Sequence, residues 1–524
     1  MAKNSSESTQ AKAPRATGNR STTPVSDSFK RYISSDWADR TDVQPASREQ
    51  AAFAAARRVR ISARHPGKRL IIPAGAAKVR SNDTDYPYRA HSAFAYLTGW
   101  GSDTVPGSVL VLEPAADGHV ATLYFREAAG RDSDEFYANP DIGEFWTGQR
   151  PSLTHVAADL TIATAGIADI TAVFDSIGAE TLLVRDADRD VTDQVDGRRL
   201  IAATMDGDEA DVVQGDSDGA GAADLDADLD GDLDLAGDVN LARDLSEMRL
   251  VKDSYEIEQM RMAVAATKQG FDDVIADLPR ITAHERGERL VEGTFNRRAR
   301  AEGNAVGYDT IAASGRHACI LHWTRNDGPV LPGDLILLDA GIELDSYYTA
   351  DVTRTLPVNG IFSALQRRVY EAVREAADAA FAIVAPGIRF REIHAEAMTI
   401  IAARTAEWGL LPVSAEESLQ PEHQHHRRYM VHGTSHHLGI DVHDCAAARR
   451  ELYLDGILEA GMVFTIEPGL YFQPDDLTVP EEYRGIGVRI EDNILVTESG
   501  AENLSIGIPR TADAVEAWLA GRSA

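Results

Sequence analysis

Cysteine is scarce in this chain. Cys319 and Cys445 are the only two in 524 residues, so a disulfide framework is excluded and a reducing compartment is expected. Long apolar runs are also missing. None reaches the length that spans a bilayer, and the N-terminus has no signal-peptide core. We therefore predict a cytoplasmic protein with no membrane partner.

Basic residues are few relative to acidic ones. The chain holds 52 Lys and Arg against 83 Asp and Glu, which gives a formal net charge of −31. Nucleic acid needs a basic surface, so it is not expected as a partner. The hydrophobic share of 44% and the charged share of 26% are those of a globular protein. At this length we expect two or three domains.

Apolar side chains are almost absent from residues 1–24, which are mainly Ser, Thr, Ala, Lys and Arg. This composition predicts disorder, and we assign residues 1–40 to a disordered N-terminal tail. Residues 41–205 then alternate helix and strand patterns, which predicts a small α/β domain without a nucleotide-binding glycine fingerprint. The expected helix covers 51–65, and the expected strands cover 69–73, 108–113, 121–125 and 180–185.

Residues 206–242 contain thirteen acidic side chains and no basic one. Asp226, Asp228 and Asp230 imitate the start of a calcium-binding loop, but Gly237 stands where a bidentate Glu belongs. We therefore interpret this stretch as an acidic low-complexity insertion in a surface loop.

The patterns of residues 243–524 predict an α+β domain, in which strands carry polar residues and long helices back the sheet. Helices are expected at 254–275, 283–301, 363–384 and 390–408, and strands at 305–322, 335–338, 462–467 and 487–496.

Four histidines and two aspartates gather in residues 430–444. Glycines within this stretch disfavour a helix. A strand would place His432, Thr434 and His436 on one face and His437 on the other. Any one of these histidines alone would be interpreted as structural. Together they suit metal binding or proton transfer, the common roles of neutral imidazole.

Two aspartates fall in neighbouring apolar strand patterns, Asp339 at the end of one and Asp351 within the next. In a symmetric antiparallel hairpin they would lie opposite each other, with Cβ atoms about 5 Å apart. Two ionised carboxylates that close repel, so one must be protonated or a cation must bridge them. The alternative is an aspartate that caps its own turn, which explains Asp339 better than Asp351.

Two glutamates are likewise carboxylates within apolar strand patterns, because Glu467 ends an apolar run and Glu491 lies inside another. Arg489 alternates onto the face of Glu491, where the two residues could form a structural ion pair. One arginine cannot neutralise four strand carboxylates. Oxygen ligands with one imidazole suit manganese, magnesium, iron, zinc or cobalt, and two ions roughly 3.5 Å apart would neutralise the site.

The motifs that carry these residues resemble the Xaa-Pro aminopeptidases (aminopeptidase P), in the metallopeptidase family that includes prolidase and methionine aminopeptidase. A weaker match at residues 88–99 extends the likeness into the first domain. The main motifs occur in family order between residues 249 and 508: Asp339-Ala-Gly, Asp351-Val-Thr-Arg-Thr, His432-Gly-Thr-Ser-His-His-Leu-Gly, Asp441-Val-His-Asp, Thr465-Ile-Glu-Pro-Gly and Arg489-Ile-Glu-Asp.

The resemblance implies a pita-bread catalytic domain behind a smaller creatinase-type α/β domain. It implies two divalent metal ions, most often manganese, and hydrolysis of the bond between an N-terminal residue and a following proline. The implied metal ligands are Asp339, Asp351, His436, Glu467 and Glu491. The other implied catalytic residues are the substrate-side histidines His322, His432 and His443, Glu467 as proton shuttle, and Arg489 as the residue that orients the bridging carboxylates.

Two departures from the family pattern stand out. The spacing from Asp339 to Asp351 is one residue longer, which we assign to the turn between them. Ala95 stands where relatives often carry a tryptophan that reaches a neighbouring subunit. That contact is therefore not predicted, although the resemblance still implies a homo-oligomer, a dimer or tetramer.

Two alternatives to an Xaa-Pro aminopeptidase stay open. A prolidase would use the same metals but take only Xaa-Pro dipeptides. A creatinase-like enzyme or a binding module would keep the fold without metal. The second alternative is disfavoured because all five ligand positions are filled.

Overall fold

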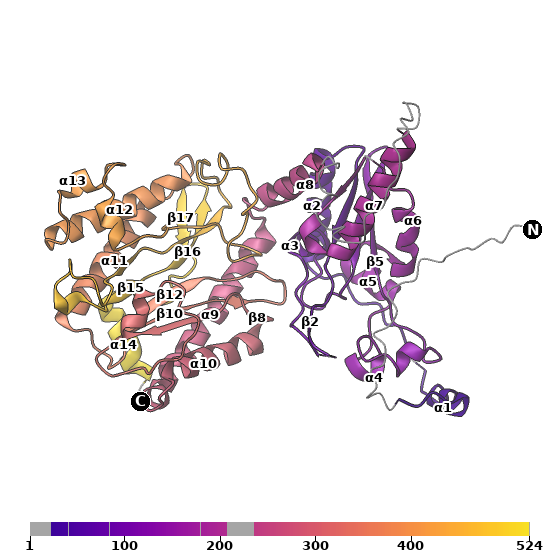
Figure 1. Cartoon of the computed structure of the whole chain (residues 1–524), viewed down its shortest axis with the longest axis horizontal. Helices are drawn as coiled ribbons and strands as arrows, with labels where there is room; N and C mark the ends of the chain where they lie inside the picture. Colours follow the sequence, from indigo (N-terminus) through magenta and orange to yellow (C-terminus); the bar gives the residue numbers. More distant parts are fainter. Residues whose placement is uncertain (1–22, 40, 83, 179, 207–234, 523–524) are drawn as a thin grey trace, which may run out of the picture.

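The computed structural model describes residues 23–39, 41–82, 84–178, 180–206 and 235–522. They form two lobes side by side, with α8 (Ala236–Met248) and α9 (Ser254–Ile281) at the junction (Figure 1). Residues 1–22 of the expected tail and the calcium-like motif at 226–231 lie outside the described residues. Within these ranges, every helix is too short or too polar to cross a membrane.

The N-terminal lobe is built on a five-stranded sheet with the order β6-β5-β4-β1-β7, in which β1 runs parallel to β7 and antiparallel to β4. The strands of the whole lobe, in which β2 and β3 pair separately, are β1 (Arg69–Pro73), β2 (Val79–Ser81), β3 (Thr84–Asp85), β4 (Val109–Ala115), β5 (Gly118–Phe125), β6 (Ala163–Gly166) and β7 (Thr181–Leu183). Its helices, besides α8, are α1 (Asp27–Ile33), α2 (Gln50–Arg64), α3 (Ser92–Thr98), α4 (Glu144–Thr147), α5 (Leu153–Leu160), α6 (Ile170–Phe174) and α7 (Arg189–Asp206).

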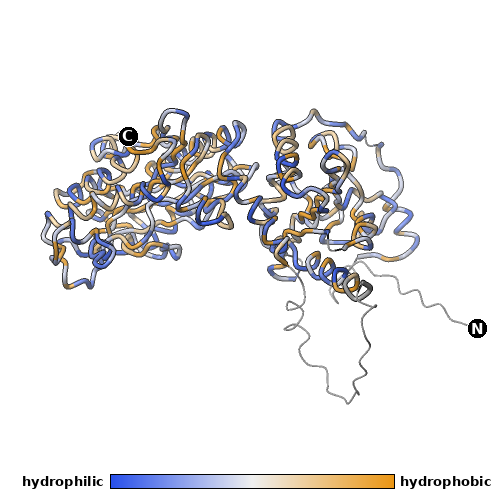
Figure 2. Tube along the Cα trace, turned by 90° about the horizontal axis from the view of Figure 1, so that it is seen from above, coloured by the Kyte–Doolittle hydropathy of each residue, from blue (hydrophilic) through white to orange (hydrophobic). Residues whose placement is uncertain are grey.

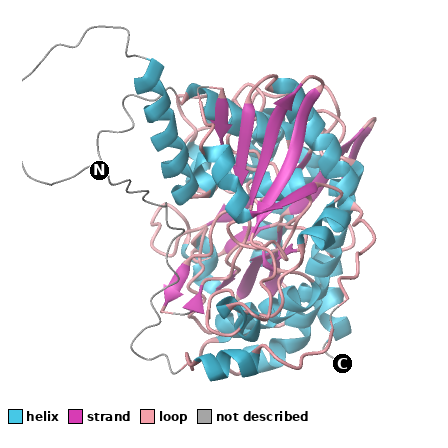
Figure 3. Ribbon diagram, turned by 90° about the vertical axis from the view of Figure 1, so that its right-hand side faces the viewer, coloured by secondary structure: helices cyan, strands magenta, loops and turns pink. Residues whose placement is uncertain are grey.

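Both faces of this sheet are covered, which explains why its strands read as continuous apolar runs. Along β1, Leu70 and Ile72 pack into one buried cluster, whereas Ile71 packs into another on the opposite face. Figure 3 shows the strands of this lobe side by side with helices around them. Figure 2, seen from above, separates the same two lobes.

Two helices lie wholly or partly inside the segments that we assigned to the tail and to the insertion, whose boundaries stay predictions. The helix α1 lies inside residues 1–40, which we assigned to a disordered tail. The helix α8 includes residues 236–242, at the end of the expected insertion 206–242. Asp238 in this helix is buried and binds Arg185, Arg199 and the amide of Leu183. These contacts stabilise α8, so the acidic run ends in an ordered helix.

The C-terminal lobe has four small sheets, with the orders β12-β10-β9, β11-β8, β13-β16-β17 and β14-β15. Its remaining helices are α10 (Gly287–Glu302), α11 (Ala364–Ala382), α12 (Phe390–Glu407), α13 (Ala415–Ser418) and α14 (Ala512–Arg522). Its strands are β8 (Ala305–Val306), β9 (Ile311–Ser314), β10 (Leu335–Ala340), β11 (Ile342–Glu343), β12 (Val352–Pro357), β13 (Val463–Ile466), β14 (Gly469–Tyr471), β15 (Gly487–Arg489), β16 (Asp492–Thr497) and β17 (Gly500–Asn503).

The long helices of this lobe begin where the sequence supplies capping residues. Asp253 and Glu256 form a reciprocal capping box at the start of α9, and Ser363 and Gln366 do the same for α11. These helices lie outside the strands (Figure 1). Their buried faces and the strands share one large apolar core, which holds the strand ends in place.

The hairpin expected between Asp339 and Asp351 has a different register. Asp339 pairs with Thr353, and Asp351 lies just before β12. The expected simple turn is absent, because residues 342–343 form β11 and pair with β8. Since the shift is two residues, both aspartates still face the same side of the sheet.

Two other expected strands are interrupted. Residues 487–496 divide into β15 and β16, and Glu491 lies in the break between them. The segment 430–444 is irregular: His437 makes one isolated bridge to Phe464, and Thr434 turns away to His394 on α12 instead of sharing a face with His432 and His436. Breaks of this kind let neighbouring side chains point into one cavity.

Candidate metal centre

A cavity of about 510 Å³ opens where β9, β10, β13 and β15 end, and it gathers residues from distant parts of the C-terminal lobe. All nine side chains predicted for the site line it: His322, Asp339, Asp351, His432, His436, His443, Glu467, Arg489 and Glu491. The strand ends therefore bring together what the sequence spreads over 170 residues (322 to 491).

Three of the predicted metal ligands form a compact set. One ligand atom each from Asp351, His436 and Glu491 lies within 4.8 Å of the other two. His436 Nε2 is 3.3 Å from Asp351 Oδ2 and 3.6 Å from Glu467 Oε1. The other ring nitrogen, Nδ1, lies 3.2 Å from the carbonyl of His437. A proton held at Nδ1 by that carbonyl leaves the Nε2 lone pair directed at the carboxylates.

The aspartates meet at Tyr308, a residue that sequence reasoning missed. The Tyr308 hydroxyl lies 2.6 Å from Asp339 Oδ1 and 2.5 Å from Asp351 Oδ1. A phenol has one proton to donate, so the two carboxyl groups share a single donor. Burial and the neighbouring charge of Asp339 raise the pKa of Asp351 well above its usual range, in agreement with this arrangement.

Arg489 contacts Asp339, which corrects the ion pair with Glu491 that strand alternation suggested. Its Nη2 atom lies 2.5 Å from Asp339 Oδ2, and its Nη1 atom donates to the Tyr471 hydroxyl at 3.0 Å. That hydroxyl lies 2.8 Å from His432 Nε2, while His432 Nδ1 lies 2.7 Å from the carbonyl of Gly433. A chain of hydrogen bonds thus runs from the arginine through Tyr471 to His432.

Glu491 is fixed from β12. The Thr353 hydroxyl donates to Glu491 Oε2 at 2.7 Å. Next to it, the fully buried guanidinium of Arg354 binds the carbonyl of Glu491 at 2.7 Å and Asp492 Oδ1 at 2.7 Å. Arg354 therefore holds the break between β15 and β16 in which Glu491 lies.

The electrostatics of the cavity favour bound cations. Burial, followed by the charge of Glu491, raises the pKa of Glu467 to about 8. Burial, followed by the charge of Asp351, raises the pKa of Glu491 well above its usual range. Four carboxyl groups with one guanidinium are costly to ionise in such a place. Divalent cations would remove that cost, so the donor set of four carboxylates and one imidazole fits hard divalent metal ions.

Two histidines of the site, His432 and His443, are arranged to stay neutral. Burial and the nearby Arg489 charge lower the pKa of His432 to about 3. Burial and the neighbouring His436 lower the pKa of His443, whose ring lies edge-on to that of His436 at 4.5 Å. His322 is exposed at the cavity lining. Neutral imidazoles can donate and accept hydrogen bonds around a substrate.

Tyr308, Thr353 and Tyr471 are thus functional candidates that the sequence did not reveal. Tyr308 lies in a short connection before β9, and Tyr471 ends β14. Neither lies in a charged or histidine-rich pattern, so only three-dimensional contact identifies them.

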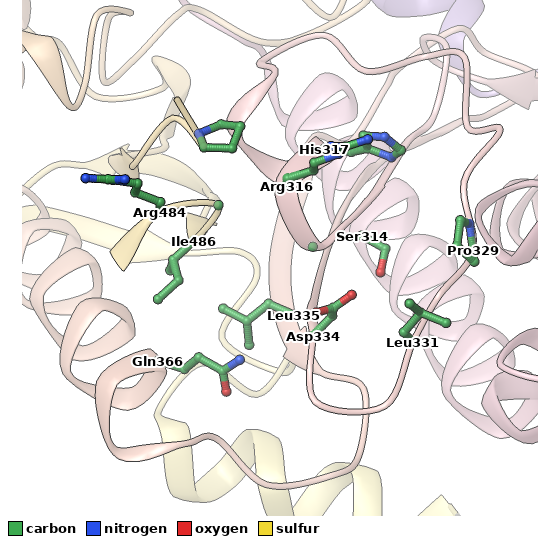
Figure 4. Close-up of a pocket in the computed structure, with 13 residues that line it drawn as sticks. Ser314, Arg316, His317, Pro329, Leu331, Asp334, Leu335, Gln366, Arg484 and Ile486 are labelled. Atoms are coloured by element: carbon green, nitrogen blue, oxygen red, sulfur yellow. The ribbon is translucent and has the colours of Figure 1, made fainter. Parts of the chain in front are cut away.

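A second cavity of about 510 Å³ lies at the other end of β9 and β10, near Ser314, Arg316, His317 and Asp334 (Figure 4). It contains none of the nine predicted site residues. Its lining is mixed, with apolar Leu331, Leu335 and Ile486 beside the polar groups.

Comparison with known proteins identifies both lobes. Residues 258–498 match the model of metallopeptidase family M24, and residues 54–183 match the aminopeptidase P N-terminal domain. Xaa-Pro aminopeptidase 1 of Streptomyces coelicolor is 47% identical over 502 residues, which cover 95% of this chain and 92% of the relative. The Xaa-Pro aminopeptidase of Escherichia coli is 32% identical over 89% of this chain and 97% of its own.

Solved structures agree. An Escherichia coli aminopeptidase P in complex with substrate superimposes with a TM-score of 0.73 at 28% identity, covering 92% of this chain and 99% of that one. The aminopeptidase PepP of Pseudomonas aeruginosa gives a TM-score of 0.72 at 30% identity, covering 90% and 98%.

The chain belongs to the aminopeptidase P family of metallopeptidases. The predicted α+β fold, a pita-bread catalytic domain behind a smaller N-terminal domain, is confirmed. The prolidase and metal-free alternatives are not favoured, because the relatives are named Xaa-Pro aminopeptidases.

Proposed function

We propose that this protein is a metal-dependent aminopeptidase that hydrolyses the bond between an N-terminal residue and a following proline. The observation that carries the proposal is the compact set of Asp351, His436 and Glu491, within a cavity lined by four predicted carboxylate ligands, the exposed Asp309 and one guanidinium. The family to which the chain belongs supports the same reaction.

The proposed ligands for two divalent ions are Asp339, Asp351, His436, Glu467 and Glu491. Asp351 and Glu491 would be the ligands common to both ions, as the resemblance to aminopeptidase P implies. Asp351 contacts His436 directly and Asp339 through Tyr308, and Glu491 lies close to Asp351 and His436. Manganese is the proposed metal, and an Escherichia coli relative has also been solved in a zinc-substituted form. Bound divalent ions would polarise the scissile carbonyl and lower the pKa of a water molecule.

Glu467 is the proposed proton carrier. In hydrolysis, water adds to the carbonyl carbon, the bond to the proline nitrogen breaks, and a proton must reach that nitrogen. The Glu467 carboxylate lines the cavity beside His436, where it can accept a proton from water and then release it. Its Oε2 atom lies 3.8 Å from His432 Nδ1, on the substrate side of the cavity.

His432, His443 and His322 are proposed to bind the substrate by hydrogen bonds. His432 is oriented through Tyr471 by Arg489, so its ring stays fixed while substrate enters. Hydrogen bonds that strengthen as the carbonyl oxygen becomes negative contribute typically a few kcal/mol each. Arg489 also contacts Asp339. It is therefore a positioning residue for a proposed metal ligand and, through Tyr471, for His432.

Release of the first amino acid from Xaa-Pro-Yaa peptides, measured with chelator and after Mn²⁺ is restored, tests the proposal. We expect release that the chelator abolishes and Mn²⁺ restores. Xaa-Pro dipeptides serve as the comparison substrate, and Xaa-Ala-Yaa peptides as the negative control. Equal release with and without metal would contradict the proposal.

We further propose a cytoplasmic homo-oligomer without nucleic acid or membrane partners. Both cysteines are free and buried, which suits a reducing compartment. The net charge of −31 opposes binding to other polyanions.

A further inference from the structure

Glu288, on α10, is a fully buried carboxylate outside the metal centre. No arginine or lysine pairs with it among the described residues; its one ionisable partner is His317, at 2.8 Å. A buried carboxylate is costly unless several donors satisfy it. The donors that surround Glu288 therefore indicate which part of the chain it holds in place.

All four donors come from one segment, residues 314–328, which follows β9. Glu288 Oε1 accepts from the Ser314 amide and from His317 Nδ1, both at 2.8 Å. Glu288 Oε2 accepts from Trp323 Nε1 at 2.9 Å and from the Gly328 amide at 2.7 Å. One carboxylate thus binds the start, the middle and the end of the segment.

The same segment carries a substrate-side histidine. Leu321, His322 and Thr324 line the cavity of the metal centre, whereas the intervening Trp323 is buried and points to Glu288. The His317 ring stacks on Trp323 with centroids 4.0 Å apart. Trp323 is therefore an anchor, and its two neighbours face the cavity.

The segment packs tightly at Gly328, against His317 and Glu288. A Cβ atom on Gly328 would lie 2.7 Å from His317 Cε1 and 2.9 Å from Glu288 Oε2. The opposite side of the segment, with Arg316 and Ser314, lines the second cavity (Figure 4). The 314–328 segment is thus a wall between two cavities, and Glu288 fixes it from within.

We propose that Glu288 is a positioning residue for substrate binding: it holds the 314–328 segment so that His322 lies at the wall of the metal-centre cavity. The inference rests on the proposed peptidase function and adds to it a determinant of substrate affinity that is neither a metal ligand nor a substrate contact.

The substitution Glu288→Gln tests this role with little change in volume. An amide has one acceptor oxygen, and its NH₂ group would face two of the four donors. Two hydrogen bonds are lost, and two donors are left without partners. We expect the KM for an Xaa-Pro-Yaa peptide to rise roughly tenfold or more, with a smaller change in kcat and unchanged metal content. Hydrogen exchange of the 314–328 amides should become faster.

The matched control is Arg316→Ala, on the same segment but directed to the second cavity. We expect its KM and its exchange rates to equal those of the wild type. Trp323→Phe keeps the ring and removes one donor, so it should raise KM by a few-fold. This milder variant keeps the proposal testable if Glu288→Gln does not fold.

A double-mutant cycle with His322→Ala separates positioning from general destabilisation. If Glu288 acts through His322, Glu288→Gln should raise KM roughly tenfold in the wild type and less than twofold in the His322→Ala background. Equal increases in both backgrounds, or an unchanged KM in a folded Glu288→Gln variant, would overturn the proposal. If the wild type itself cleaves no Xaa-Pro-Yaa peptide, the proposed function fails, while hydrogen exchange still reports whether Glu288 fixes the segment.

Discussion

Asp351 Oδ2 lies 3.3 Å from His436 Nε2, although the two residues lie beside different sheets of the C-terminal lobe. Asp351 stands just before β12, and His436 lies beside β13, where the Thr465 amide donates to its carbonyl at 2.9 Å. Their proximity therefore depends on how the sheets that contain β12 and β13 pack together, and not on any local motif. It places an imidazole lone pair next to a group of carboxylates that has one guanidinium, that of Arg489, beside it.

Replacing Asp351 with alanine should release metal. The substitution removes a carboxylate proposed to bind both ions, so the metal bound per chain should fall well below that of the wild type. Elemental analysis after dialysis against dilute Mn²⁺ measures this. Asp345→Ala, at a site where the carboxylate only accepts from Ser102, is the control and should keep the wild-type metal content. A fully loaded, fully active Asp351→Ala variant would remove the residue from the ligand set.

Replacing Glu467 with glutamine should reduce turnover. An amide cannot accept and return a proton at the proline nitrogen, so kcat should fall by about 10²–10⁴-fold at saturating Mn²⁺. Steady-state kinetics on an Xaa-Pro-Yaa peptide give the ratio. Glu459→Gln, on an exposed turn, should leave kcat unchanged. Wild-type turnover in the Glu467 variant would show that another group carries the proton.

The stability of the metal-free protein should depend on pH. Glu467 has a pKa of about 8 in the folded, metal-free protein, against 4.5 for an ordinary glutamate, so unfolding releases a proton between these values. The free energy of unfolding should therefore be highest below pH 4.5 as far as this group is concerned, and fall as pH rises toward 8, by about 1.4 kcal/mol per pH unit. Asp351 and Glu491 act in the same direction.

Urea unfolding in the presence of chelator, at several pH values from 5 to 8, measures this slope. Glu467→Gln should reduce the slope, and saturating Mn²⁺ should abolish it because bound cations stabilise the ionised carboxylates. A metal-free protein whose stability rises over this range would contradict the electrostatic account.

Arg354 should prove necessary for the fold of the site. Its fully buried guanidinium binds Asp492 and the carbonyls of Glu491 and Ile508. Arg354→Met removes all of these bonds and leaves Asp492 with Arg510 and Asn503 alone, so it should lower the free energy of unfolding by about 3–5 kcal/mol. Arg367→Met, which removes half-exposed pairs with Asp513 and Glu516, should change it by less than about 1 kcal/mol. Denaturant unfolding compares the two, and equal effects would deny Arg354 this role.

The sequence predicted the membership of the site better than its geometry. Polar residues inside apolar strand patterns identified Asp339, Asp351, Glu467 and Glu491, because burial without a partner is costly. The register did not follow, since residues 342–343 pair with β8 instead of forming a simple turn. The roles of the nine residues, and the domain boundaries at 205 and 243, stay predictions.

Residues that support the site had no signal in the sequence. Tyr308 and Tyr471 are ordinary aromatic residues until the fold places their hydroxyls against Asp339 and His432. Glu288 lies in a charged helix pattern, typical of a solvated face, and only the fold shows that it is buried. Long-range contacts of this kind depend on tertiary packing, which local patterns do not encode.

Anomalous diffraction from crystals equilibrated with Mn²⁺ tests the central claim most directly. The account predicts two anomalous peaks in the cavity, with oxygen or nitrogen ligands from Asp339, Asp351, His436, Glu467 and Glu491. A cavity without anomalous signal at saturating Mn²⁺, or metal bound by other residues, would contradict it.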